Sequence, residues 1–212
     1  MSEAQPACRL IVAVETDESA RKRLEAALSA GGIASVIILP QRDQPLVADL
    51  ARPLVSVAQQ AGAAALILDE ARLARALGAD GVHLQAGSSA ADYEAARELL
   101  GRGSIVGADA GRSRDAAMRL GEAGADYIGF GIPDFVTDRS SARERRLDLI
   151  QWWAEIFEVP CVALDVDAQE DAEELARAGA DFVAIRLAGS TSTDAARDAV
   201  RAALAALSAP VS

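Results

Sequence analysis

The sequence predicts a single-domain (β/α)₈ barrel, and three observations support that prediction. A helix-like run ends in Gly-Ala-Asp at 78–80, 124–126 and 179–181, and each copy precedes a short apolar run. Gly just past a helix adopts the left-handed conformation that ends it, and an unbroken apolar run is typical of a strand covered on both faces. Eight strand–helix units can be placed in all, and 212 residues suit one barrel.

The strands are predicted from short aliphatic runs, and each ends at a turn signal or a polar residue. Pro40 closes the second of them, because proline cannot continue a central ladder. The expected strands are 9–14, 34–39, 64–68, 81–84, 104–107, 126–130, 161–164 and 182–187.

The helices are predicted from the longer segments between the strands. Gly31 and Gly32 stop the first helix, and Ser89 is a good N-cap for the fourth. The expected helices are 18–30, one within 45–61, 71–77, 90–100, 114–123, 143–157, 169–178 and 194–207.

An open doubly wound sheet is the alternative fold. It would normally carry a glycine-rich phosphate turn after its first strand, whereas the turn at 15–19 reads Glu-Thr-Asp-Glu-Ser. No linker or low-complexity segment interrupts the chain. We therefore expect one domain over 1–212, with its core at about 8–208.

Composition narrows the classes of function. The net charge is −11 and Lys22 is the single lysine, so we expect no nucleic-acid partner, which would need a basic stripe. No run approaches the roughly 20 apolar residues of a membrane span, and 1–7 shows no secretion signal. We expect a cytoplasmic protein, in which Cys8 and Cys161 are buried free thiols.

In a barrel, chemistry belongs at the carboxyl ends of the strands. Asp109, Asp165 and Asp167 fall there and would form a site for a cation or an amine, or else are solvated loop acids that cap helices. His83 is either a proton-transfer group or a hydrogen-bonded core residue. Because neighbouring helical residues point about 100° apart, Trp152 and Trp153 cannot fill one core pocket, and an aromatic patch at a homodimer contact is one interpretation.

Four segments resemble the thiamine phosphate synthase family and its relatives, the thiazole tautomerases. They are Leu-Ile-Leu-Asp-Glu-Ala-Arg-Leu-Ala at 66–74, Gly-Ala-Asp-Gly-Val-His-Leu at 78–84, Gly-Ala-Asp-Tyr-Ile-Gly-Phe-Gly at 124–131 and Ala-Gly-Ala-Asp-Phe-Val-Ala at 178–184. They occur in the family's order and at about its spacing.

The resemblance implies a synthase that joins a pyrimidine diphosphate to a thiazole phosphate and releases pyrophosphate, with Mg²⁺ on the leaving oxygens. It also implies roles for individual residues. Arg42 and Arg139 would be catalytic cations, Gln41, Gly131 and Arg186 would bind small phosphorylated substrates, and Asp69 would bind the metal.

The chain departs from the family's pattern at several of these positions. Ser88 stands where the second Mg²⁺ ligand is expected, and Arg139 replaces a lysine. The Gly-Gly pair that would hold a phosphate after the seventh strand is Asp165-Val166 here. A carboxylate repels a phosphate, and side chains block close approach of the backbone.

Two functions therefore remain open from the sequence. The first is a working transferase of thiamine biosynthesis. The second is a catalytically degenerate barrel that acts as a small-molecule-binding or regulatory protein.

Overall fold

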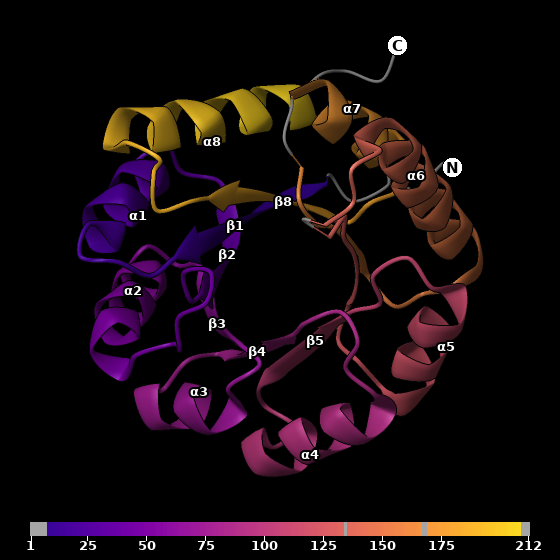
Figure 1. The fold of residues 1–212 in the computed structure, drawn as a ribbon, viewed down its shortest axis with the longest axis horizontal. Coiled ribbons are helices and arrows are strands. Elements are labelled where there is room, and N and C mark those ends of the chain that lie inside the picture. The colour runs from indigo at the N-terminus through magenta and orange to yellow at the C-terminus, as the bar shows by residue number, and fades with distance from the viewer. Residues whose placement is uncertain (1–7, 134, 167–168, 209–212) are drawn as a thin grey trace, which may run out of the picture.

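The chain forms a closed eight-stranded parallel barrel surrounded by eight helices, as the sequence predicts (Figure 1). This computed structural model describes residues 8–133, 135–166 and 169–208, without the side chains of residues 169 and 170. The strands pair in sequence order around the ring, and β1 closes the barrel by pairing with β8. This closure excludes the doubly wound alternative.

Strands and helices alternate without interruption. The strands are β1 (Arg9–Glu15), β2 (Ile33–Leu39), β3 (Ala64–Leu68), β4 (Gly81–Leu84), β5 (Ile105–Asp109), β6 (Ile128–Phe130), β7 (Cys161–Ala163) and β8 (Phe182–Leu187). The helices are α1 (Ala20–Leu28), α2 (Ala48–Gln60), α3 (Ala71–Leu77), α4 (Ala90–Leu100), α5 (Arg114–Ala123), α6 (Arg139–Ile156), α7 (Gln169–Arg177) and α8 (Thr193–Leu207).

Helix α6 is the main correction to the expected boundaries. It begins at Arg139, four residues earlier than the sequence suggested. Asp138 is its N-cap, and its Oδ1 accepts a hydrogen bond from Ser141 N at 3.1 Å. A side-chain cap of this kind satisfies a backbone donor that the first turn would leave open. Arg139 is therefore a first-turn helical residue and not a loop residue.

The three Gly-Ala-Asp joints end helices, as expected, and the structure shows what their aspartates do. Gly78 and Gly124 are left-handed C-caps of α3 and α5. The carboxylates of Asp80, Asp126 and Asp181 accept hydrogen bonds at 2.6–2.8 Å from the backbone N–H of Ala65, Val106 and Cys161 respectively. Each aspartate thus ties the entry of its own strand to the start of the preceding strand, and the repeated motif is scaffold.

The hydrophobic core has two layers. Side chains that point outward from the strands pack against the helices, and Val82, Ile128 and Phe130 are fully buried there. A smaller cluster fills the inside of the barrel, including Ile37 and Tyr127. The inside of the barrel is therefore packed with side chains, as is usual in this fold.

Cys8 and Cys161 are free thiols, half-buried and buried respectively. Trp153 is 1% exposed, whereas Trp152 is half-buried and its ring centre lies 4.7 Å from the Arg114 guanidinium carbon. The two indoles therefore occupy different environments, and the homodimer contact stays a prediction.

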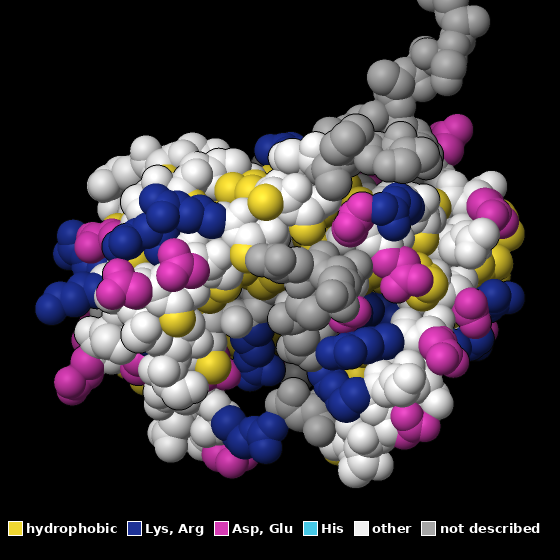
Figure 2. Space-filling view, turned by 90° about the horizontal axis from the view of Figure 1, so that it is seen from above, with side chains coloured by type: hydrophobic (Ala, Val, Ile, Leu, Met, Phe, Trp, Pro, Cys, Tyr) yellow, Lys and Arg dark blue, Asp and Glu magenta, His cyan; other side chains and the backbone are white. Residues whose placement is uncertain are grey.

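The surface agrees with the charge balance of the sequence. On the face shown in Figure 2, Lys and Arg side chains are interspersed with Asp and Glu side chains and form no continuous stripe. In the part of the chain that is described, no helix is both long and apolar enough to cross a membrane.

Candidate active site at the barrel mouth

A cavity of about 360 Å³ opens at the carboxyl ends of the strands. Its size falls in the range of small-molecule sites, and its position is the one that barrel enzymes use. The polar side chains that matter in its wall are Gln41, Arg42, His83, Asp109, Asp165 and Arg186. The structure therefore brings together three of the predicted site residues, namely Gln41, Arg42 and Arg186.

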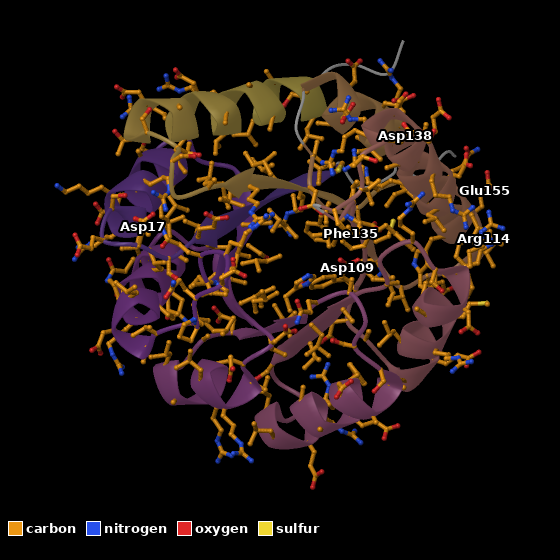
Figure 3. The ribbon with its side chains drawn as sticks, in the orientation of Figure 1. Asp17, Asp109, Arg114, Phe135, Asp138 and Glu155 are labelled. Carbon is orange, nitrogen blue, oxygen red and sulfur yellow. The ribbon has the colours of Figure 1, made fainter. Side chains whose placement is uncertain are left out.

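These side chains reach the mouth because residues along a strand alternate between its two faces. In β5, Val106 and Ala108 pack outward, so Asp109 at the strand's end faces inward. In β8, Val183 and Ile185 pack outward, so Arg186 faces inward. Figure 3 shows Asp109 inside the ring of helices, whereas Arg114 and Glu155 lie at its outer edge.

Arg186 is tied to a carboxylate that the sequence did not single out as its partner. Glu15, at the end of β1, accepts hydrogen bonds from Arg186 Nε at 3.1 Å and from Arg186 Nη2 at 2.7 Å. The second oxygen of Glu15 accepts a hydrogen bond from Gly189 N at 2.8 Å. β1 and β8 are neighbours in the closed barrel. The alternation of side chains along each strand, which points both residues toward the inside of the barrel, is the feature of the sequence that could have indicated this pair. The charge of Arg186 is largely balanced before any ligand arrives.

The carboxylates of Asp109 and Asp165 both lie beside Gly131. A Cβ atom on Gly131 would lie 3.0 Å from Asp109 Oδ2 and 2.9 Å from Asp165 Oδ2. Asp109 Oδ1 accepts a hydrogen bond from Gly111 N at 2.7 Å. Burial, together with the charge of Asp165, raises the pKa of Asp109 to about 7. The third carboxylate of the predicted cluster, Asp167, lies outside the described residues.

A buried arginine fixes the backbone on which Asp165 sits. Arg146 of α6 is 2% exposed, and its Nη1 donates to the carbonyl oxygens of Leu164 at 2.6 Å and Asp165 at 2.9 Å. Asp165 has φ +54°, a left-handed value that aspartate tolerates better than most residues. Its Oδ2 accepts a hydrogen bond from Ile132 N at 3.1 Å. The carboxylate therefore faces Gly131, in place of the open backbone that a phosphate would need.

His83 forms part of the cavity wall from β4. It is 5% exposed, and its Nδ1 lies 2.7 Å from the hydroxyl oxygen of Tyr127. Burial lowers its pKa to about 4, so the imidazole is neutral at physiological pH. The prediction of a hydrogen-bonded core histidine is confirmed. Gly107 makes room for this pair, because a Cβ there would lie 1.9 Å from the Tyr127 ring.

Asp69 lies outside the mouth cavity. It lines a separate hollow of about 990 Å³ beside α3 and α4, together with Ser88 and Asp92. Its Oδ1 accepts a hydrogen bond from Gln85 N at 2.8 Å, and burial raises its pKa. Gln85 lines both hollows. Asp69 is not the cap of α3, because Glu70 occupies the N-cap position and the Asp69 carboxylate accepts from Gln85 N.

The residues around Asp69 offer little for a metal. Among the described residues, no three His, Cys, Asp or Glu side chains are grouped as a ligand set. The carboxylate of Asp92 forms a capping box with Ser89. The donor set fits only a cation that takes most of its ligands from substrate oxygens and water, which Mg²⁺ commonly does.

Arg139 and Gly131, like Asp69, are not among the residues that line the mouth cavity. Arg139 is half-buried at the start of α6, where its Nη1 donates to Ile132 O at 3.4 Å. That contact orients it toward the loop after β6. Gly131 is buried behind the two carboxyl groups. Phe135, in the same loop, is 84% exposed and lies inside the ring of helices in Figure 3.

Comparison with known proteins identifies the family. The family model described as thiamine monophosphate synthase matches residues 8–188. The chain belongs to this family. It is 39% identical over 169 residues to a thiamine-phosphate synthase of Erythrobacter litoralis, covering 77% of this chain and 78% of the relative. It is 38% identical over 187 residues to a thiamine-phosphate synthase of Hyphomonas neptunium, covering 86% and 84%.

Solved structures support the fold. Thiamine phosphate pyrophosphorylase from Pyrococcus furiosus superimposes with a TM-score of 0.75 at 22% identity, over 96% of both chains. A tryptophan synthase of Mycobacterium tuberculosis does so with a TM-score of 0.77 at 16% identity, over 97% of this chain and 95% of the other. In this member of the thiamine monophosphate synthase family, the mouth of the shared barrel carries a carboxyl pair.

Proposed function

We propose that this chain joins a pyrimidine diphosphate to a thiazole phosphate and releases pyrophosphate, the reaction that the resemblance to its family implies. The observation that carries the proposal is the convergence of Gln41, Arg42 and Arg186 on one cavity at the barrel mouth. Cationic and amide groups at one rim are what a diphosphate and a polar ring require. The alignments with the two thiamine-phosphate synthases extend over 78% and 84% of those relatives, which supports the same assignment.

The reaction breaks the bond between the pyrimidine methylene carbon and the diphosphate oxygen. Pyrophosphate leaves with the electron pair, and the thiazole nitrogen supplies the pair for the new C–N bond. The chain's task is to stabilise charge on the leaving oxygens, which is usually the largest contribution to catalysis. Arg42 is exposed at the rim and Arg139 stands at the start of α6, and we assign both to the leaving group.

The remaining residues bind and orient the substrates. We assign Gln41 to the pyrimidine and Arg186 to the thiazole phosphate, with the backbone of Gly131 behind them. Mg²⁺, when bound, would neutralise the leaving oxygens, and Asp69 is the residue that would hold it. Asp69 lines the neighbouring hollow, and Gln85, whose N–H its carboxylate accepts, lines both that hollow and the mouth cavity.

A turnover assay with both phosphorylated substrates and Mg²⁺ tests this function. We expect Arg42→Gln to lower kcat/KM by about a hundredfold, because a charge that stabilises the leaving group is lost. We expect Asp69→Asn to raise the Mg²⁺ concentration needed for half-maximal rate by about tenfold or more. Asp115→Asn, on the exposed side of α5, is the matched control and should leave both quantities unchanged.

Two results would count against this assignment. Absence of product from the parent protein would end the transferase function. Turnover that survives Asp69→Asn with the same Mg²⁺ requirement would remove the metal role of Asp69 alone.

A second candidate function is binding of a small molecule without transfer. The observation that favours it is the occupation of the expected phosphate end by Asp165, whose Oδ2 takes the Ile132 N–H. The pairing of Arg186 with Glu15 acts in the same direction, since it reduces attraction for a phosphate. Saturable binding at the mouth without product formation would establish this function in place of the first.

A further inference from the structure

The outer sides of α5 and α6 carry exposed apolar side chains beside an aromatic cluster. Met118 of α5 is 37% exposed, and Ile156, the last residue of α6, is 62% exposed. Trp152 of α6 is half-buried, and its ring centre lies 5.4 Å from that of Phe157. An apolar surface formed by neighbouring elements is typical of a protein–protein contact.

These side chains lie along the seam between the two helices. The Arg114 guanidinium carbon, at the start of α5, lies 4.7 Å from the centre of the Trp152 ring. Further along α5, a Cβ on Gly121 would lie 3.0 Å from the Trp153 ring. Residues three and four apart share one side of a helix. Met118, which stands between Arg114 and Gly121, is therefore on the side of α5 that faces α6.

Ile156 extends this apolar seam to the end of α6. It follows Trp152 by four residues and therefore lies on the same side of the helix. We call the surface formed by Met118, Trp152 and Ile156 the α5–α6 patch. Trp, Met and Arg are enriched in protein–protein interfaces. The patch, with the guanidinium of Arg114 over its indole, has that composition.

The rim of the α5–α6 patch carries one charge of each sign. Arg114 is exposed on α5, and within the described part of the chain it takes part in no ion pair. Glu155 is exposed on α6, where its Oε1 accepts a hydrogen bond from Gln151 Nε2 at 3.2 Å. Figure 3 shows Arg114 and Glu155 at the same outer edge of the ring of helices. A two-fold axis through the patch exchanges its two edges, so Arg114 of each copy can face Glu155 of the other.

We propose that the α5–α6 patch is the contact of a symmetric homodimer, in which a second copy of this chain covers the patch and Arg114 pairs with Glu155 of the partner subunit. A second copy is the occupant because the patch is self-complementary, with an apolar middle and opposite charges on its rim. A strongly acidic or basic partner would instead require one sign of charge there. The patch lies outside the barrel, so the proposal does not depend on the function proposed for the mouth.

Sedimentation equilibrium of the full chain tests the proposal, because it measures molar mass against concentration. We expect the parent protein to have twice the mass of one chain at about 50 μM. Ile156→Glu places a charge in the apolar middle of the contact. This variant should raise the Kd of the dimer by about thirtyfold or more.

Two charge-reversed variants test the pairing between copies. Arg114→Glu places two negative charges opposite each other in a homodimer, and Glu155→Arg places two positive charges there, so each should raise the dimer Kd by about tenfold or more. An equimolar mixture of the two should dimerise as the parent does, because both pairs then have opposite signs. Arg201→Glu and Asp198→Arg reverse the same charges at exposed positions of α8 and should leave the mass unchanged.

Three outcomes would overturn the proposal. The first is a parent protein that stays monomeric up to about 100 μM. The second is a parent dimer that persists in Ile156→Glu and in both charge-reversed variants, which would place the contact elsewhere. The third is a mixture that stays monomeric although each charge-reversed variant alone has dissociated. Recovery of the dimer in the mixture also shows that both variants are folded, so loss of structure cannot imitate the expected result.

Discussion

Replacing Arg146 with methionine is expected to lower the free energy of unfolding by about 3 kcal/mol. Methionine fills much of the volume of the arginine stem, but it cannot donate to the carbonyls of Leu164 and Asp165 or pair with Asp171. Removing one side of a buried charged network leaves the other side desolvated without compensation. Urea denaturation of parent and variant measures the difference.

Arg143→Met is the matched control for this substitution. Arg143 lies on the same helix and contacts the same carboxylate, with its Nε 3.2 Å from Asp171 Oδ2, but its side chain is 43% exposed. An exposed pair contributes about 0–1 kcal/mol. Equal losses for the two variants would contradict the role that we give to burial at Arg146.

Replacing Asp109 with asparagine is expected to stabilise the protein at about pH 8 by about 2 kcal/mol. The folded-state pKa of Asp109 is raised to about 7, mainly by burial and then by the charge of Asp165. A raised carboxyl pKa contributes stability below the unfolded value of about 4, and this contribution is lost as the pH rises through 7. Each pKa unit by which the folded value exceeds the unfolded value corresponds to about 1.4 kcal/mol of stability. Water in the open mouth screens the carboxyl and makes the expected gain smaller than this conversion gives.

The pH dependence is what distinguishes this effect from simple packing. Asparagine keeps an oxygen that can accept from Gly111 N, but it cannot ionise. The free energy of unfolding of the variant should therefore increase relative to that of the parent as the pH rises from about 5 to 8. The titratable groups that interact electrostatically with this carboxyl are Asp165 and the buried hydroxyl of Tyr127. Asp115→Asn should show no such trend. A stability difference between Asp109→Asn and the parent that is equal at both ends of the range would exclude the titration as its cause.

Much of the scaffold could be predicted from the sequence. The Gly-Ala-Asp joints, the apolar strands and the absence of a glycine-rich first turn were enough for a closed barrel. The start of α6 was misplaced because the cap depends on Asp138 reaching Ser141 N. The run at 139–146, rich in arginine and serine, gives no periodic apolar signal for a helix start.

The site was predictable only in part. Gln41, Arg42 and Arg186 could be placed at the mouth because they lie at or just after the carboxyl ends of strands. The pairing of Arg186 with Glu15, in contrast, depends on how β8 closes against β1. The meeting of Asp109 and Asp165 depends on Gly131, which follows the strand between theirs and has no side chain to separate them. The buried Arg146 that fixes Asp165 comes from a helix whose amphipathic pattern is weak, and its role required the tertiary structure.

Two carboxyl groups, of Asp109 and Asp165, line the barrel mouth where a phosphate-binding backbone was expected. Carbon-13 NMR titration of aspartate-labelled protein, with the Asp109 resonance assigned by its loss in Asp109→Asn, measures the pair directly. We expect a midpoint near 7 in the parent and a lower pKa for Asp109 in Asp165→Asn, because a neighbouring negative charge is removed. A midpoint near the ordinary value of about 4, or one that Asp165→Asn leaves unchanged, would contradict the claim.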